Sequence, residues 1–204
     1  MTLTTTDLHE FLRSRRSVRR FKSDPVPDSV IERVLSTATF APSAHNRQPW
    51  RFVVLTDANV KAGLAERMAA EFEHDLVADG LPAEEIEKQV SRSKRRIRGA
   101  PVLIVLCMET REMDSYPDDK RRQAERMMAV QSVAAAGQQL LLAAHAEGLG
   151  GVWVCSPLFA PEAVRRALEL DESLQPQGMY FIGYPEDIPP ARERKHLEDV
   201  IVSK

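Results

Sequence analysis

The spacing of apolar residues predicts helices along much of this chain. Apolar side chains between residues 30 and 38 recur every three or four positions, the period of an amphipathic helix. Comparable segments, separated by prolines, glycines or polar turns, predict further helices. These lie at residues 6–12, 59–78, 83–98, 122–147 and 161–170. The glycines of GLGG (148–151) follow the longest of them, as expected at a helix C-terminus.

Strands are predicted where short apolar and β-branched runs lie between turn residues. These runs cover residues 51–57, 101–108, 152–156 and 178–185. The run at 101–108 contains no polar side chain, so that strand is expected to be buried on both faces. About four strands, a long central helix and several covering helices predict a single α+β domain over residues 1–204.

The second half of the helix predicted at 122–147 is apolar on nearly every face (AVQSVAAAGQQLLLAAHA, residues 129–146). A helix of this kind must be buried on all sides. In a chain of 204 residues, this indicates that part of the helix meets a second subunit. The small residues Ala134, Ala135, Ala136 and Gly137 are candidates for a close helix approach in that interface.

Charge restricts the class of partner. The formal net charge is −2, so the five arginines of RSRRSVRRF (13–21) are a local feature. A nucleic-acid-binding domain usually carries a basic surplus over its whole surface. Nucleic acid is therefore not an expected partner, and the arginines are either a solvated basic face or a pocket for one anion.

Targeting and metal-binding signals are also missing from the sequence. The first residues, MTLTTTDLHE, lack an apolar signal region, and the longest apolar run, at 102–108, is too short to cross a bilayer. The five histidines are scattered, so no metal site is predicted. Cys107 and Cys155 each lie within an apolar run, which is typical of small core side chains in a reducing compartment. We expect a cytoplasmic protein.

The sequence contains no nucleophile elbow, phosphate loop or GxGxxG motif, so an enzyme of this sequence would depend on a bound cofactor. No side chain is assigned as a catalytic residue. Arg15, Arg16 and Arg19 surround Ser17, and a second basic pair, Arg192 and Arg194, lies near the C-terminus. Guanidinium groups with a hydroxyl provide what a phosphate ester requires, namely bidentate donors and full positive charge. Two distant basic clusters in a slightly acidic chain therefore indicate one shared anion.

Four segments, in this order along the chain, resemble the FMN-dependent nitroreductase family. They are RRSVRRF (15–21), APSAHNRQPWRF (41–52), GLGGVWV (148–154) and RERKHLEDVI (192–201). The resemblance extends over roughly residues 8–201. It implies an α+β nitroreductase-like fold with a central antiparallel-type sheet flanked by helices. It also implies an intertwined homodimer with FMN at the subunit interface. The bound FMN would be reduced by NAD(P)H or another donor.

The resemblance also implies which residues bind FMN. An N-terminal group would contact the phosphate and the pyrimidine edge, and a C-terminal basic pair would close on the phosphate. A loop of the other subunit would approach the isoalloxazine ring, and a segment after the third strand would pass the flavin. The N-terminal group is Arg15, Arg16, Ser17 and Arg19, and the C-terminal pair is Arg192 and Arg194. The loop of the other subunit contributes Pro42, Ser43, Asn46 and Gln48. The segment after the third strand contains Cys155 and Ser156.

Three segments resemble more closely the flavin-binding domain that is fused to some F-420 γ-glutamyl ligases. They are RMAAEFEHDLVADGLPAEEIEKQV (67–90) and SYPD (115–118), both within the excursion at 61–120, and GLGGVWVCSPLFAPEAVRRALEL (148–170). This resemblance implies FMN-dependent reduction of a dehydro precursor of the deazaflavin coenzyme F-420. Two alternatives stay open, a general NAD(P)H-dependent nitroreductase or quinone reductase, and a flavin-binding or storage protein without turnover. A basic run within the excursion at 61–120 either contacts an anionic substrate tail or is a solvated helix face. Its residues are Lys94, Arg95, Arg96 and Arg98.

Overall fold

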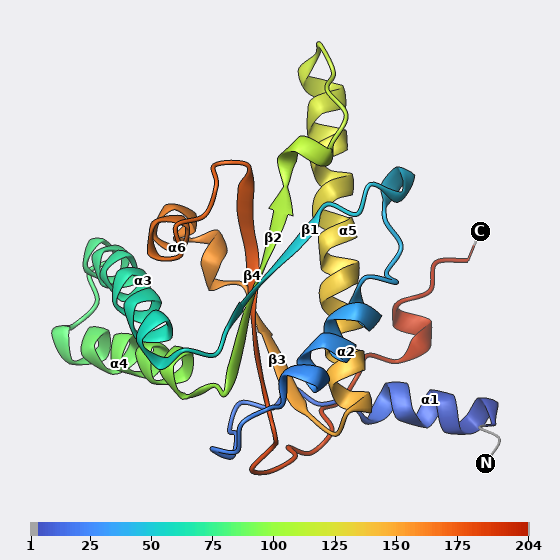
Figure 1. Ribbon diagram of the computed structural model, residues 1–204, viewed down its shortest axis with the longest axis horizontal. Coiled ribbons are helices and arrows are strands. Elements are labelled where there is room, and N and C mark those ends of the chain that lie inside the picture. Colours follow the sequence, from blue (N-terminus) through green and yellow to red (C-terminus); the bar gives the residue numbers. More distant parts are fainter. Residues whose placement is uncertain (1–3, 204) are drawn as a thin grey trace.

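A computed structural model describes residues 4–203, and its strands form one four-stranded sheet (Figure 1). The strand order is β1-β2-β4-β3, and every neighbouring pair is antiparallel. The strands are β1 (Trp50–Leu55), β2 (Val102–Glu109), β3 (Gly150–Val154) and β4 (Leu174–Gly183). The predicted α+β fold with an antiparallel sheet is confirmed.

Helices cover both faces of this sheet. The α-helices are α1 (Thr5–Ser14), α2 (Asp28–Ala38), α3 (Ala58–Ala78), α4 (Ala83–Gly99), α5 (Asp119–Ala146) and α6 (Pro161–Ala167). Figure 1 shows α2 and α5 on one side of the sheet and α3, α4 and α6 on the other. Short 3-10 turns are η1 (Ala44–Asn46), η2 (Thr110–Glu112), η3 (Ser156–Leu158) and η4 (Leu197–Asp199).

Strand β2 lies at the centre of the core, and all eight of its residues are buried, as predicted for the run at 101–108. Alternate side chains point to opposite faces of a sheet. Ile104 and Leu106 accordingly belong to the core under α2 and α5, whereas Leu103 and Val105 belong to the core under α3 and α6. The chain therefore has two hydrophobic layers, one on each side of one sheet.

Strands β1, β3 and β4 begin earlier than predicted, β1 by only one residue. Strand β4 begins at Leu174 instead of 178 and contains Pro176, which pairs with Cys107 where the register of the two strands shifts. Proline is tolerated at such an irregularity because a ladder hydrogen bond is already missing there. Strand β3 begins at Gly150 instead of 152 and ends at Val154 instead of 156. A glycine at 150 allows close contact with the N-terminal segment, since a Cβ atom there would lie 2.7 Å from the Val18 Cβ.

About half of the apolar second half of α5 is buried within one subunit, and contact of the rest with a second subunit stays a prediction. The buried part packs between α2 and the sheet, in the core that contains Leu140 and Ala144. Gly137 contacts Tyr180 of β4, so its small size serves this internal contact. Ala134 and Ala135 remain half-buried. Among the described residues, α5 is long and apolar enough to span a membrane, and half of that stretch is buried inside the protein.

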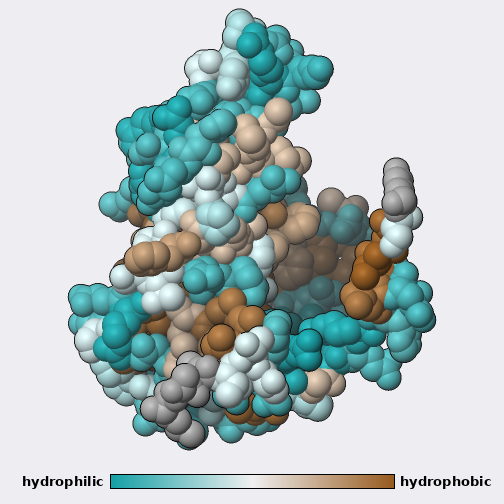
Figure 2. All heavy atoms as spheres, turned by 90° about the vertical axis from the view of Figure 1, so that its right-hand side faces the viewer, coloured by the Kyte–Doolittle hydropathy of each residue, from teal (hydrophilic) through white to brown (hydrophobic). Residues whose placement is uncertain are grey.

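Both terminal segments expose apolar side chains. Helix α1 buries none of its ten residues, all of which the structure describes. The segment after β4 exposes five large apolar side chains, Ile188, Leu197, Val200, Ile201 and Val202. Figure 2 shows hydrophobic surface on this segment and in the hollow between it and the body of the protein.

Candidate functional site

Three segments that are distant in sequence meet at the β3 edge of the sheet. Ser17 pairs with Gly151 of β3, and the Val18 amide donates to the Gly151 carbonyl at 3.1 Å. The same N-terminal segment then contacts the chain that follows β4. The Lys22 amide donates to the Tyr184 carbonyl at 2.9 Å. The two predicted basic clusters are thus carried on neighbouring segments.

Arg15 shows the clearest sign that this edge binds an anion. Its Nη1 is buried and has no hydrogen-bond partner among the described residues. Burial lowers the pKa of Arg15, and the positive charges of Arg194 and Arg16 lower it further. Within residues 4–203, none of these three arginines forms an ion pair with a carboxylate. Partly buried like charges without a counter-ion are costly, so the group is suited to a bound anion such as a phosphate.

The other arginines of the two basic clusters differ in their contacts and exposure. Arg16 donates from Nη1 to the carbonyls of Arg13 and Arg15, at 2.6 and 2.9 Å. Arg19 donates to the Ser17 carbonyl at 3.2 Å and extends away toward α4. Arg192 is exposed, and the part of the chain that the structure describes gives its side chain no hydrogen bond or ion pair. One subunit therefore brings together Arg15, Arg16, Ser17 and Arg194, with Arg19 at one side.

The loop predicted to approach the flavin ring is held in shape by its own polar groups. The Gln48 amide donates to the Ser43 hydroxyl at 3.1 Å, and the Gln48 side chain donates to Asn46 Oδ1 at 3.2 Å. Asn46 and Gln48 have left-handed backbone angles, with φ of 52° and 50°. Pro42, Asn46 and Gln48 are exposed and Ser43 is half-buried. The loop thus displays polar side chains on a constrained backbone.

Within one subunit this loop lies far from the arginine site. The Ala44 amide donates to Ser132 Oγ at 3.1 Å, near the middle of α5. Ser14, beside Arg15, hydrogen-bonds to His145 Nε2 at 2.8 Å, at the C-terminal end of α5. These two anchor points are 13 residues apart, which is about 20 Å along a helix axis. One subunit alone does not place Asn46 and Gln48 beside Arg15.

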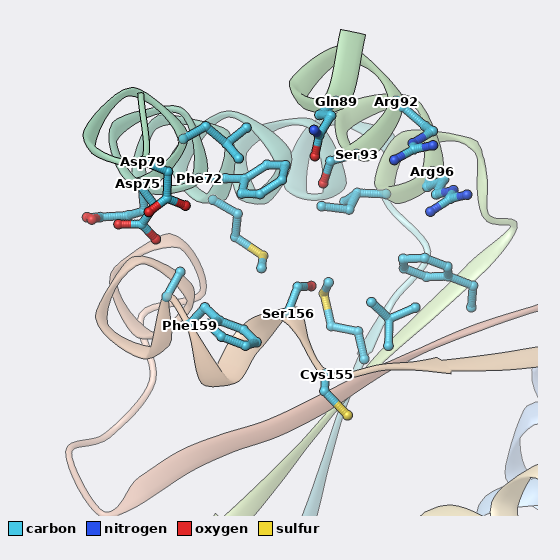
Figure 3. Close-up of a pocket in the computed structure, with 18 residues that line it drawn as sticks. Phe72, Asp75, Asp79, Gln89, Arg92, Ser93, Arg96, Cys155, Ser156 and Phe159 are labelled. Carbon is cyan, nitrogen blue, oxygen red and sulfur yellow. The ribbon is translucent and has the colours of Figure 1, made fainter. Parts of the chain in front are cut away.

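The segment after β3 borders a cavity of about 540 Å³ (Figure 3). Ser156 begins η3, and Figure 3 shows its hydroxyl facing the cavity while the Cys155 thiol is directed away from it. The cavity lies between this segment and the hairpin formed by α3 and α4. Its labelled lining residues are Phe72, Asp75, Asp79, Gln89, Arg92, Ser93, Arg96, Cys155, Ser156 and Phe159.

The two cysteines do not share the predicted environment. Cys107 is buried in β2, and burial raises its pKa to about 12. Cys155 is exposed, so the prediction that it is a core side chain is wrong. The reason is that β3 ends at Val154, which leaves Cys155 in the turn before η3.

Several cavity residues could not be singled out from the sequence. Arg92 lies outside the basic run 94–98 that the sequence indicates, although it is four residues before Arg96 and thus on the same side of α4. That spacing was the available signal. Phe72 and Phe159 come from different elements, α3 and the turn after η3, and no sequence pattern joins them.

Known proteins are similar to this chain in sequence over most of its length. YfhC of Bacillus subtilis (strain 168), which carries the name of an NAD(P)H nitroreductase, is 28% identical over 192 residues, covering 94% of this chain and 91% of YfhC. The 5,6-dimethylbenzimidazole synthase of Rhodospirillum rubrum is 31% identical over 191 residues, covering 90% of this chain and 84% of that protein.

A solved structure and a family model agree with these relatives. A Desulfovibrio desulfuricans protein named as a nitroreductase and solved in complex with FMN is 25% identical, with a TM-score of 0.74. The match covers 100% of this chain and 98% of that one. The model of the nitroreductase family matches residues 12–184. The chain therefore belongs to the nitroreductase family.

Proposed function

We propose that this protein is an FMN-dependent oxidoreductase that uses NAD(P)H to reduce a conjugated, nitro or quinone acceptor. When bound, FMN supplies hydride transfer between the reductant and the acceptor. The observation that carries the proposal is the buried, unpartnered Nη1 of Arg15, grouped with Arg16 and Arg194 among the described residues. A relative named as an NAD(P)H nitroreductase and a similar structure in complex with FMN support it.

In this proposal each segment of the site has a separate role toward FMN. Arg15, Arg16 and Arg194, together with the exposed Arg192, neutralise and orient the phosphate, and the Ser17 hydroxyl donates to it. Arg19 donates to the pyrimidine edge of the ring. The backbone at Cys155 and Ser156 passes beside the ring. The chain thus orients the cofactor and excludes water, and no side chain is required as an acid or base.

We also propose that two copies of the chain complete each site as a homodimer. Pro42, Ser43, Asn46 and Gln48 would then reach the flavin of the partner subunit. Within one chain, the points on α5 that anchor the loop and the arginine segment lie roughly 20 Å apart, which supports this arrangement. The exposed apolar side chains of the C-terminal segment support it further, because such surface is usually covered by a partner.

A charge placed in the C-terminal apolar segment is expected to disrupt this dimer. The purified protein should scatter light as a particle of about 46 kDa, twice the 22.9 kDa of one chain. Val200→Asp or Ile201→Asp should shift the mass toward one chain and release FMN, because both would bury a carboxylate in the interface. Val77→Asp is the matched control, since Val77 is similarly exposed but lies on α3. An FMN-loaded wild-type monomer would contradict the proposal.

Labelling of thiols tests where the flavin lies. Cys155 should react quickly with a disulfide reagent, whereas the buried Cys107, with its raised pKa, should react only on unfolding. FMN should slow the labelling of Cys155, and Cys155→Ser should remove the fast-reacting thiol. Equal labelling rates of Cys155 with and without bound FMN would contradict the proposed position of the ring.

The acceptor is the part of the proposal with the most open alternatives. Reduction of a dehydro precursor of coenzyme F-420 remains a prediction from the resemblance of residues 67–90, 115–118 and 148–170, and none of the relatives named above is named for it. A flavin-storage protein would bind FMN without turnover. Steady-state oxidation of NADPH and NADH, coupled in turn to a quinone, a nitrofuran and the dehydro precursor, distinguishes the three. The proposal expects turnover of at least one acceptor, and FMN binding without any turnover would contradict it.

A further inference from the structure

Helix α4 carries two groups of basic residues with different surroundings. One group is neutralised by carboxylates. Lys94 Nζ lies 2.7 Å from Glu66 Oε2, and Arg98 pairs with the other oxygen of Glu66 on α3. Lys88 pairs with Glu85 at 3.6 Å. The contacts to Glu66 join the two helices of the hairpin, so Lys94 and Arg98 belong to the structure of the hairpin.

The second group, Arg92, Arg95 and Arg96, has no carboxylate partner within residues 4–203. These arginines line a groove of about 320 Å³ together with Arg19 and Arg20. Glu186 also lines the groove, and it lies 3.7 Å from Arg20. Arg20 pairs in addition with Asp187 at 3.0 Å. Among the described residues, the groove therefore has three arginines of α4 without a carboxylate partner, beside Arg19, which donates to the Ser17 carbonyl and is assigned above to the flavin.

Arg92, Arg95 and Arg96 are exposed on α4, and their like charges repel one another. Partial burial lowers the pKa of Arg96, and the charges of Arg92 and Arg19 lower it further. Arg92 and Arg96 are four residues apart on one side of α4, where like charges destabilise a helix. The other basic residues of α4 are paired with carboxylates of the protein. The unpaired arginines are therefore suited to an anionic group supplied by a ligand.

Arg92 and Arg96 also line the larger cavity, so the two hollows adjoin at these side chains. Figure 3 shows them at one end of the cavity, whose walls include Phe72 and Phe159. The lining also includes apolar side chains from β4 and α3, among them Met179. A ligand that fits this arrangement has an apolar or aromatic body and an anionic group.

We propose that Arg92, Arg95 and Arg96 bind a phosphate or carboxylate group of one of the substrates. This site would be separate from the FMN phosphate site at Arg15 and Arg194. The inference rests on the proposed function, because it assigns a substrate class to that enzyme. The anionic group belongs either to the nicotinamide dinucleotide or to the acceptor, and the two half-reactions distinguish these sources.

The test uses FMN-loaded protein and the variants Arg96→Gln and Arg92→Gln/Arg96→Gln. The reductive arm compares NADPH and NADH, and the oxidative arm compares para-nitrobenzoate with the neutral para-nitrobenzyl alcohol. If the arginines bind the dinucleotide, loss of a charge-assisted hydrogen bond should raise KM for NADPH or NADH about tenfold or more. If they bind the acceptor, KM for para-nitrobenzoate should rise by that amount instead. KM for the neutral acceptor and the FMN content should stay unchanged. Lys88→Gln, an exposed charge on the same helix, should behave as wild type.

A binding measurement separates failure of this inference from failure of the proposed function. Calorimetric titration of the FMN-loaded protein with inorganic pyrophosphate requires no turnover. Weaker pyrophosphate binding in the variants would support the anion site even if no acceptor were reduced. The inference would be overturned by any of three results. These are equal changes in KM for the anionic and neutral acceptors, unchanged pyrophosphate binding in the variants, and loss of FMN from folded Arg96→Gln. The last of these would assign the arginines to the flavin instead.

Discussion

Arg15→Ala is expected to release FMN from an otherwise folded protein. The guanidinium of Arg15 is partly buried beside Arg16 and Arg194, and its Nη1 has no partner among the described residues. In the proposed complex, the phosphate supplies that partner. Losing one charge-assisted hydrogen bond should cost about 1.5–3 kcal/mol, which weakens FMN binding about 10- to 150-fold. Arg194→Ala should have an effect of similar size.

Fluorescence titration of the apoprotein with FMN measures this effect directly. Arg13→Ala is the matched control, since Arg13 is an exposed arginine at the end of α1 and lies two residues from Arg15. It should bind FMN as the wild type does. Circular dichroism should show that all three variants are folded. Unchanged FMN affinity in both Arg15→Ala and Arg194→Ala would contradict the proposed phosphate site.

Two helical glycines should respond in opposite directions to replacement with alanine. A Cβ atom at Gly137 would lie 1.8 Å from Tyr180 Oη and 2.6 Å from its Cζ, in a fully buried contact between α5 and β4. Overpacking of this kind typically costs about 1–3 kcal/mol, and we expect Gly137→Ala to lower the free energy of unfolding by that amount. A Cβ atom at Gly63 on α3 would meet no other part of the described chain within 4 Å. Gly63→Ala should therefore raise the free energy of unfolding by about 0.5–1 kcal/mol.

A second substitution tests whether Tyr180 causes the difference. Its buried hydroxyl makes no hydrogen bond to the described residues. Tyr180→Phe removes that hydroxyl, so alone it should be neutral or stabilising. In combination with Gly137→Ala it should recover part of the lost stability, because it removes the 1.8 Å contact with the hydroxyl and keeps the 2.6 Å contact with Cζ. Urea unfolding of the four variants gives these free energies, and a destabilised Gly63→Ala with an unaffected Gly137→Ala would contradict the packing described for α5.

Local patterns were sufficient to predict most of the fold. The uninterrupted apolar run at 101–108 predicted a strand buried on both faces, and β2 is that strand. The helical period predicted α3 and α4 within one or two residues of their observed ends. These features are recorded in the spacing and composition of short segments, which a local pattern can capture.

Features that depend on distant contacts could not be predicted in this way. Pro176 is typical of a strand breaker, yet the irregular pairing with Cys107 allows it inside β4. Gly137 was interpreted as a site of close approach between subunits, whereas its neighbour is Tyr180 of the same chain. The different surroundings of Lys94 and Arg96 depend on Glu66 of another helix. In each case the deciding partner lies far away in the sequence.

The candidate site was predictable only in part, for the same reason. The motifs around Arg15 and Arg194 indicated two basic clusters, and the pairing of the first segment with β3 explains how they meet. The exposed position of Cys155 depends on where β3 ends, which is one residue earlier, at Val154. Binding of FMN by these residues remains a prediction.

The central claim, that bound FMN passes reducing equivalents from NAD(P)H to an acceptor, is tested most directly by anaerobic stopped-flow spectroscopy of the FMN-loaded protein. NADPH or NADH should bleach the visible flavin absorbance at a rate that saturates with reductant concentration. One equivalent of a quinone or nitro acceptor should then restore it, and both steps should be at least as fast as steady-state turnover. Bound FMN that neither reductant reduces faster than free FMN would contradict the account and identify a flavin-storage protein.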